Sequence, residues 1–474
     1  MSWLVARQSK GAFLLRIEDT DQERSVAGAT ENILKTLAWA GMQPDEGVML
    51  QGDSAVQKGT KGPYIQSERQ AQGLYGKYAD ELLKSGHAYH CFCTPQRLEE
   101  MRKKQEARKQ APMYDRQCVK LSPEEVDAKL KAGERYVIRM KVPHERIIAF
   151  EDEIRGKVQF QGHTVDDQVL LKSDGFPTYH LAHVVDDHLM EIDLVIRGEE
   201  WLSSLPKHLL LFEFLGWKPP RYAHVPLLLN KDRTKLSKRQ NSVAVEEYMQ
   251  KGYLPEALVN FLALLGWNPG TTQELFTMEE LVSAFSLDRV QKAGAVFDTE
   301  KLDWLQGQWI RKIPLKEFME RIRPLVAEKY PDAATDKMLE KKAALIQERI
   351  TFFAEAPDML SFFYIKPNVS LDLLISSKQK VTKENLPRAL EVIENILKSI
   401  PGKEWTSDRL LAAFQEKVKE GEWKLGQLLW PLRVALTGRA YSPGAVEVAE
   451  AMAEEQGTEA VLQRVQTALA LTTS

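Results

Sequence analysis

The sequence predicts an α/β region that is interrupted by an inserted α+β module and followed by an all-helical C-terminal half. Strand and helix patterns alternate over residues 1–89 and again over residues 176–232, while residues 90–175 between them are more charged. Strand signals become rare after about residue 245. A chain of 474 residues is long enough for several domains.

The first piece reads as one strand and two helices. Apolar residues from Ala12 to Ile17 predict a strand, and a helix is expected from Ala29 to Ala40, closed by Gly41. A second helix is expected from Gln70 to Ser85. This alternation is typical of an α/β layer.

The inserted segment carries its own helix starts. Thr94-Pro95 opens a charged helix, Ser122 and Glu125 form a capping box for another, and residues 136–142 alternate like a half-buried strand.

The α/β pattern then returns and gives way to helices. Strands are expected at 194–196 and 225–229, with a helix started by Pro206 between them, and we expect both α/β pieces to share one sheet. The apolar run 254–267 is too short for a bilayer and predicts a buried helix. Helix stops are expected at Gly266, Gly402, Gly421 and Gly438.

Charge and cysteine content narrow the class of protein. A formal net charge of −3 excludes a uniformly basic protein that coats nucleic acid, although local basic patches can still bind phosphates. The chain has three cysteines, and its first residues lack the charged-then-apolar order of a secretory signal. We therefore expect a cytoplasmic protein without a membrane segment.

A polar stretch at residues 230–239 contains Lys235, Ser237 and Lys238. When a carboxylate attacks the α-phosphate of ATP, negative charge grows on the departing pyrophosphate, and positioned ammonium groups stabilise it. A basic loop that is merely solvated is the alternative for such a short match. We favour the phosphate-binding interpretation, because this stretch is one of a series of motifs that run in order along the chain.

Those motifs resemble bacterial and organellar glutamyl-tRNA synthetases, which are class I aminoacyl-tRNA synthetases, and the similarity extends end to end. It is carried by Arg-Ile-Glu-Asp-Thr-Asp at 16–21 and by residues 63–69, 172–182, 184–188, 196–201, 230–239, 296–304 and 430–438.

The resemblance implies a Rossmann-like catalytic domain (residues 1–89 and 176–232) and an inserted module at 90–175 that holds the tRNA acceptor end. It further implies a stem-contact helical domain at 233–312 with the lysine loop, and an anticodon-binding region at 313–474. The implied reaction joins L-glutamate to tRNA(Glu) with ATP and Mg²⁺, in a monomer that binds neither DNA nor membrane.

Free glutamate carries one ammonium and two carboxylates, and a specific site must meet each of them. By resemblance, Glu18 faces the ammonium, while Tyr179 and Arg197 contact the carboxylates. Glu200 reaches the nucleotide, and the backbone at Leu228 lies against the adenine. Without the resemblance, Glu18 would be a surface residue and Arg197 a salt-bridge partner of Glu199 or Glu200.

His183 departs from the family pattern, since many relatives have asparagine there, beside the side-chain carboxylate of glutamate. A protonated imidazole would suit that anion, whereas a neutral one held by Asp186 or Asp187 would mainly pack. Both readings stay open.

The start of the chain also departs from that pattern. Relatives begin with a nucleotide-binding strand and a histidine signature, and the sequence as written opens after them. We expect a misassigned start or a fragment, and impaired activity of the chain as written.

Cys91, Cys93 and Cys118 resemble the zinc-binding form of this family. Tyr114 could supply a fourth ligand, whereas Lys120 replaces the histidine that some relatives carry. Three ordinary free thiols are the alternative.

The resemblance implies that the helical C-terminal half reads the anticodon, where unstacked bases need aromatic or arginine side chains to stack on. The candidates are Arg349, Trp405, Arg433 and Arg439. Core packing is the alternative for the tryptophans.

Two other functions compete with this one. A glutaminyl-tRNA synthetase is disfavoured by the acidic residues 18–21, and the short synthetase-like enzyme that glutamylates a tRNA base is disfavoured by the long helical half. The competitor from another class is a non-catalytic tRNA-binding paralogue, which the departure at the start favours.

Overall fold

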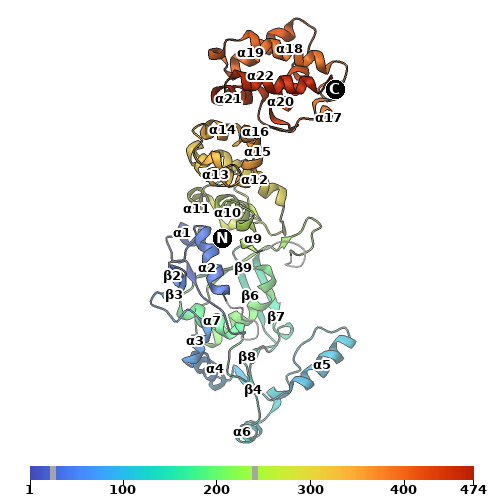
Figure 1. Ribbon diagram of the computed structural model, residues 1–474. Helices are drawn as coiled ribbons and strands as arrows, with labels where there is room; N and C mark the ends of the chain where they lie inside the picture. Colours follow the sequence, from blue (N-terminus) through green and yellow to red (C-terminus); the bar gives the residue numbers. More distant parts are fainter. Residues whose placement is uncertain (22–27, 237–243, 474) are drawn as a thin grey trace. The chain divides into compact units, whose positions relative to one another are not determined.

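The computed structural model describes residues 1–21, 28–236 and 244–473 (Figure 1). The chain divides into two compact units, of which the first comprises Met1–Glu247 and Val259–Asp298 and the second Tyr248–Leu258 and Thr299–Ser474. No helix among the described residues is long and apolar enough to cross a membrane.

A small three-stranded sheet opens the first unit. Strand β1 (Leu14–Leu15) runs parallel to β2 (Glu46–Gln51), which pairs antiparallel with β3 (Ser54–Lys58). Gly47 is required here because a Cβ at this position would lie 2.1 Å from the carbonyl oxygen of Leu15.

A second sheet has the strand order β7-β6-β10-β9. Strand β9 (Leu194–Gly198) is parallel to β10 (Arg221–Val225), and β10 is parallel to β6 (Ile147–Asp152). Strand β7 (Gly156–Gln161) closes the β6–β7 hairpin. Two strands from within the segment 90–175 therefore belong to the sheet that carries Arg197.

The apolar stretch expected as one strand at 225–229 is two short strands. Strand β10 ends at Val225 because Pro226 has no N–H to donate to a ladder. The chain resumes as β11 (Leu228–Leu229), which pairs with β12 (Ala295–Val296).

The third sheet, of order β4-β5-β8, packs with helices around an apolar core that includes Tyr75, Leu170, Val184 and Leu211. The helix expected at 70–85 is in fact two helices, because Gly73 has a φ of 72° that ends the first and begins the second. The strands are β4 (Ala88–Cys91), β5 (Val137–Met140) and β8 (Val169–Leu171); the helices of the first unit include α1 (Ser2–Gln8), α2 (Ala29–Trp39), α3 (Gln66–Ala71), α4 (Leu74–Lys84), α5 (Pro95–Ala107), α6 (Pro123–Lys131), α7 (Tyr179–Leu189), α8 (Leu205–Phe214) and α11 (Met278–Ala284).

The two α/β pieces do not share one sheet among the described residues, contrary to expectation, since β1 pairs with β2 and β9 with β10. Buried side chains connect them instead. Asp186 on α7 accepts hydrogen bonds from Gln66 (2.8 Å) and Tyr75 (2.9 Å) and pairs with Arg69 (2.6 Å). A buried carboxylate requires several such partners to offset its lost hydration.

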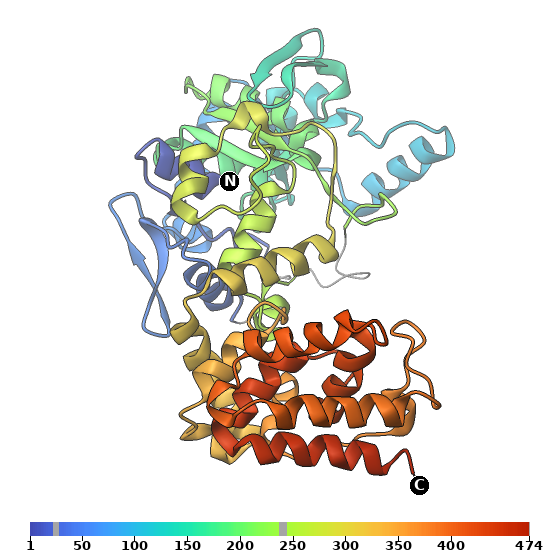
Figure 2. The same cartoon turned by 90° about the horizontal axis from the view of Figure 1, so that it is seen from above.

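The second unit is helical in its described part, as predicted for the C-terminal half; the orange to red ribbons of Figure 2 are its later helices. Gly438 ends α20 in a left-handed conformation (φ 65°), as expected. Gly402 does not end a helix, because α18 has already stopped at Ser399 before Pro401. Its helices include α12 (Thr299–Lys312), α13 (Leu315–Lys329), α14 (Leu339–Ile346), α15 (Ala356–Met359), α16 (Ser361–Tyr364), α17 (Leu371–Leu374), α18 (Leu386–Ser399), α19 (Ser407–Lys419), α20 (Leu425–Thr437), α21 (Ala445–Gln456) and α22 (Thr458–Ala470). The chain first enters this unit within α9 (Val245–Gln250) and returns to the first unit within α10 (Pro255–Leu264).

Candidate active site

One face of α7 gathers three polar side chains. Tyr179, His183 and Asp187 are four residues apart, so they lie one above the other on the helix. The Tyr179 and His183 rings stack with centroids 5.1 Å apart, and His183 Nε2 lies 3.2 Å from Asp187 Oδ2. Because His183 is buried beside Arg16, its pKa falls from 6.5 to about 3, and its imidazole is neutral. A neutral imidazole is the form that the packing alternative requires, although neither His183 Nε2 nor Asp187 Oδ2 makes a hydrogen bond with the described residues.

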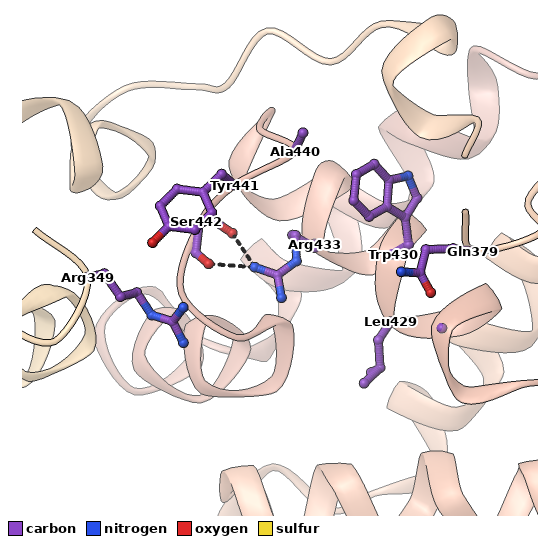
Figure 3. A pocket seen from close by; sticks show the side chains of 9 residues that line it. Arg349, Gln379, Leu429, Trp430, Arg433, Ala440, Tyr441 and Ser442 are labelled. Carbon is purple, nitrogen blue, oxygen red and sulfur yellow. Dashed lines mark hydrogen bonds between the residues drawn. The ribbon is translucent and has the colours of Figure 1, made fainter. Parts of the chain in front are cut away.

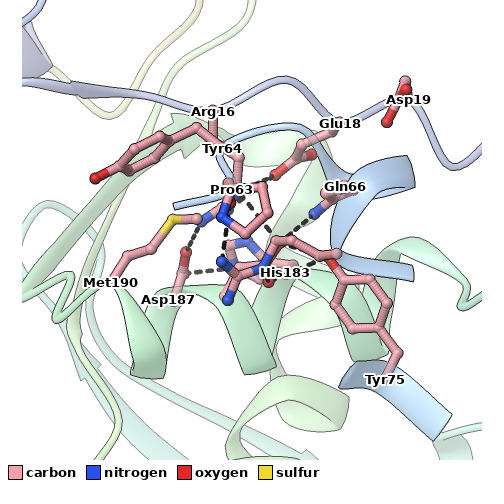
Figure 4. Close-up of polar contacts among 12 residues, drawn as sticks. Arg16, Glu18, Asp19, Pro63, Tyr64, Gln66, Tyr75, His183, Asp187 and Met190 are labelled. Carbon is pink, nitrogen blue, oxygen red and sulfur yellow. Dashed lines mark hydrogen bonds and ion pairs between the residues drawn. The ribbon is translucent and has the colours of Figure 1, made fainter. Parts of the chain in front are cut away.

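Arg16 joins this face to Glu18 (Figure 4). Its guanidinium lies 3.0 Å from Asp187 and 2.9 Å from Glu18, and its side chain is only 10% exposed. Although burial lowers the pKa of Arg16, the carboxylates around it raise that pKa above its ordinary value, so the cation persists. Glu18 keeps 35% of its side chain exposed, which leaves its carboxylate accessible beside α7.

Arg197 on β9 makes three hydrogen-bonding contacts, and one of its nitrogen atoms, Nη2, is left without a partner in the described part of the chain. Its Nη1 lies 3.4 Å from the Tyr179 hydroxyl and 3.3 Å from His208 Nδ1, and its Nε donates to His224 Nε2 at 3.1 Å. Nη2 is buried and has no hydrogen-bond partner among the described residues. An unpaired buried donor is costly, and a substrate carboxylate would satisfy it.

The acidic neighbours of Arg197 in the sequence do not neutralise it. Glu199 pairs with Arg155 at 2.6 Å, and Glu200 lies 4.0 Å from Lys235. The salt-bridge alternative for Arg197 is therefore not what the structure contains. Its charge stays available to a ligand.

Glu200 and Lys235 are both exposed and sit beside β11. The carbonyl of Leu228 accepts from the N–H of Leu236 at 2.9 Å, which ties the start of the lysine loop to this strand. Ser237 and Lys238, the other two side chains expected to handle phosphate, lie outside the described residues.

The three cysteines converge although they are distant in sequence. Their Sγ atoms all lie within 4.8 Å of one another, with Cys93 and Cys118 at 3.5 Å. The Tyr114 hydroxyl lies 3.4 Å from the Cys91 Sγ and 3.3 Å from the Cys93 Sγ. The pKa of the Cys91 thiol lies below its ordinary value, chiefly because of the neighbouring Cys118 thiol.

The second unit contains a pocket of about 350 Å³ (Figure 3). Arg349 lines it and is exposed, and its guanidinium makes no hydrogen bond or ion pair with the described residues. Arg433 also lines it, but its guanidinium is held by Ser442 and Pro443. The rest of the lining is Gln379, Gly426, Leu429, Trp430, Ala440, Tyr441 and Ser442.

Two other residues expected near RNA have structural partners. Trp405 is buried and donates to the carbonyl of Ile400 at 3.1 Å, so it packs in the core. Arg439 donates to the hydroxyl of Ser361 at 3.1 Å.

Sequence reasoning gave no role in the site to His208, Tyr222, His224 or Asp152. Tyr222 lies under the Arg197 guanidinium, 5.4 Å from ring centroid to Cζ, and its buried hydroxyl has no partner among the described residues. His224 could have been noticed in the sequence, because it lies inside an apolar strand and a buried imidazole needs polar partners.

Comparison with known proteins places this geometry in a family. Residues 1–304 match the model of the catalytic domain of class I tRNA synthetases (E and Q), and residues 317–469 match an anticodon binding domain. A glutamate–tRNA ligase of Chlorobium luteolum is 45% identical over 98% of this chain and 92% of the relative. One from Chlorobium phaeovibrioides is 44% identical over 100% of this chain and 90% of the relative.

Solved structures agree with the sequence matches. A crystal structure of a glutamate–tRNA ligase from Elizabethkingia meningosepticum, in complex with its amino acid, has a TM-score of 0.82 and 32% identity over 99% of this chain and 94% of that chain. A glutamate–tRNA synthetase from Elizabethkingia anophelis also has a TM-score of 0.82, with 33% identity over 99% of this chain and 95% of that chain. The chain therefore belongs to the glutamate–tRNA ligase family of class I aminoacyl-tRNA synthetases.

Proposed function

We propose that this chain is a glutamate–tRNA ligase, which activates L-glutamate with ATP and transfers the glutamyl group to the 3′ end of tRNA(Glu). The observation that carries this proposal is the unpaired, buried Nη2 of Arg197 beside the Tyr179 hydroxyl. Together they offer donors to a carboxylate, while Glu18 offers an anion to an ammonium group. A negatively charged amino acid satisfies both.

The first step needs positioning rather than a protein nucleophile. A carboxylate oxygen of glutamate attacks the α-phosphate, the bond to the β-phosphate breaks, and pyrophosphate leaves. Lys235 and Lys238 would neutralise the leaving group, Ser237 would donate a hydrogen bond, and Glu200 and the Leu228 backbone would bind the nucleotide. ATP enters with Mg²⁺, which shields part of the phosphate charge.

The second step joins the activated glutamate to tRNA. The terminal ribose hydroxyl attacks the glutamyl carbonyl, and AMP departs as the leaving group. Residues 90–175 would hold the acceptor end, residues 233–312 the stem and residues 313–474 the anticodon. On α5, Lys103 pairs with Glu99 at 2.6 Å, which supports a largely solvated face with few phosphate contacts.

Arg349 would contact an unstacked anticodon base. Its guanidinium is free of described partners and shares the pocket with the exposed Tyr441 ring, so a base could stack and hydrogen bond there. Arg433 would keep that wall in place through Ser442.

The cysteine cluster would bind a zinc ion. Tetrahedral Zn–S bonds of about 2.3 Å place sulfur atoms roughly 3.8 Å apart, and the three Sγ atoms already lie within 4.8 Å. The Tyr114 oxygen lies close enough to Cys91 and Cys93 to complete the set. The ion would hold the turn between β4 and the segment around Cys118.

ATP–pyrophosphate exchange and aminoacylation test this function. The purified chain with a tRNA(Glu) transcript should exchange and charge with glutamate and not with glutamine. Lys235→Ala should lower kcat by about 100-fold, whereas Lys218→Ala, at an exposed lysine in the loop that follows α8, should not. Binding of tRNA without exchange would instead identify a non-catalytic paralogue, and a preference for glutamine would identify a glutaminyl enzyme.

A further inference from the structure

We propose that Asp152 and His224 act as a positioning pair that fixes the orientation of Arg197 toward the substrate carboxylate. This inference rests on the proposed function and deepens it. It assigns a role in glutamate recognition to two buried residues that do not contact the ligand themselves.

The pair is buried and fully connected. His224 Nδ1 lies 2.6 Å from Asp152 Oδ2, and both side chains are 0% exposed. Asp152 Oδ1 accepts from the backbone N–H groups of Ile154, Arg155 and His224 at 3.0, 2.9 and 3.2 Å. Although burial alone would raise the pKa of Asp152, these hydrogen bonds and that from His224 hold it below its ordinary value, so the carboxylate is ionised.

Three neighbouring strands bring the residues into line. In the register of the sheet, Tyr222 on β10 lies opposite Asp152 on β6, and His224 lies opposite Arg197 on β9. Asp152 therefore reaches Arg197 through the imidazole that lies between them. The imidazole ring of His224 thus separates the negative charge of Asp152 from Arg197 and its ligand.

The chemistry of the guanidinium fixes the tautomer of His224. Arg197 Nε–H can only donate, so His224 Nε2 must be the acceptor and carries no proton. The proton then sits on Nδ1 and is donated to Asp152. An ionised Asp152 is the partner that selects this tautomer.

This arrangement decides which donor of Arg197 is left for a ligand. His224 takes Nε, while Tyr179 and His208 take Nη1, so Nη2 alone stays unpaired among the described residues. His208 accepts on Nδ1, which leaves its Nε2–H to donate to His180. Without the acceptor on His224, the guanidinium could rotate and Nη2 would lose its fixed direction.

Two substitutions take the acceptor at Nε2 away from Arg197: Asp152→Asn, which keeps the size of the side chain, and His224→Asn, which shortens it. Asp152→Asn would offer N–H instead of oxygen to Nδ1, so the imidazole would move its proton to Nε2 and face Arg197 donor to donor. His224→Asn keeps a polar atom where Nδ1 lies but none where Nε2 lies. His224→Gln, in contrast, places an amide oxygen at the position of Nε2.

Steady-state aminoacylation of wild type and variants, with thermal unfolding as a folding check, tests the inference. We expect Asp152→Asn and His224→Asn to raise the KM for glutamate by about 10- to 100-fold, with the KM for ATP near wild type. The melting temperature should fall, because a buried hydrogen-bonded pair is broken, but each variant should still unfold cooperatively above the assay temperature. His224→Gln should restore most of the glutamate affinity. Asp53→Asn, whose side chain is 96% exposed, is the matched control and should change nothing.

Two results would overturn the inference. Equal KM values in His224→Asn and His224→Gln would mean that the acceptor at Nε2 does not matter, and an unchanged KM in Asp152→Asn would mean that the carboxylate does not. Both are distinguishable from failure of the proposed function, in which the wild-type chain itself would not activate glutamate and both proposals would fall together.

Discussion

The hydroxyl of Tyr179 accepts a hydrogen bond from Nη1 of Arg197 at 3.4 Å, across the gap between the first turn of α7 and β9. Because the phenol oxygen is the acceptor, its own proton is left to donate. Burial raises the pKa of Tyr179, so that proton is retained at neutral pH. Tyr179 and Arg197 thus present two donors to one anion.

Replacing Arg197 by lysine should weaken glutamate binding. Lysine keeps the charge but cannot contact His224, Tyr179 and a carboxylate together, because it lacks the planar fork. We expect the KM for glutamate to rise by about 100-fold while the KM for ATP stays unchanged. Arg221→Lys on β10, with its side chain 60% exposed, is the matched control; equal effects in both would contradict a role specific to Arg197.

Glu18→Gln should reduce discrimination for the ammonium group. Glutarate has both carboxylates of glutamate but no ammonium, so it gains nothing from Glu18. We expect glutamate affinity to fall by about 10-fold or more, while inhibition by glutarate is retained or strengthened. Competition assays with both compounds measure the ratio of their affinities. An equal loss of affinity for glutamate and glutarate would show that Glu18 supports the structure of the site and does not contact the ammonium group.

The buried histidines should make the first unit sensitive to acid. The pKa values of His180 and His183 fall from 6.5 to about 3 on burial, so the unfolded chain binds protons that the folded chain does not. The free energy of unfolding should therefore decrease as pH falls below 6.5, by up to about 1.4 kcal/mol per pH unit for each histidine, until about pH 3.

Thermal unfolding between pH 7 and pH 5 tests this sensitivity. His183→Asn should lose part of the slope, whereas His163→Asn, at an exposed position, should keep it. Since His183 is neutral throughout this range, we also expect no contribution from it to the pH dependence of the glutamate KM. A KM that rises with pH in wild type and not in His183→Asn would contradict the neutral imidazole.

Metal analysis tests the cysteine cluster. We expect about one zinc ion per chain, lost in Cys91→Ser and Cys118→Ser and bound more weakly in Tyr114→Phe. Tyr136→Phe, an exposed tyrosine in the same segment, is the control. Wild-type protein without stoichiometric zinc would remove the metal proposal and leave three free thiols.

Arg349→Gln should act on tRNA alone. We expect the KM for tRNA(Glu) to rise by about 10-fold or more, with glutamate and ATP unaffected, because the pocket lies in the helical unit. Arg388→Gln, on α18 with its side chain 64% exposed, is the matched control. An equal rise in both variants would indicate general charge attraction rather than base recognition.

The sequence by itself determined the α/β region, the helical C-terminal half and the family, and these predictions are confirmed. Each depends on local information: apolar periodicity, caps such as Ser122 with Glu125, and motifs in a fixed order. Tyr179, His183 and Asp187 could also be placed on one helix face, since their spacing of four is a property of the chain.

Only the tertiary structure decided how distant segments meet. It brought Arg16 against Asp187, placed the β6–β7 hairpin beside β10, and set His224 between Asp152 and Arg197. No periodicity encodes these contacts, because each joins segments that are far apart in the chain. What selects them is the need of every buried charge for a partner, and that need can be met only after the fold has brought the segments together.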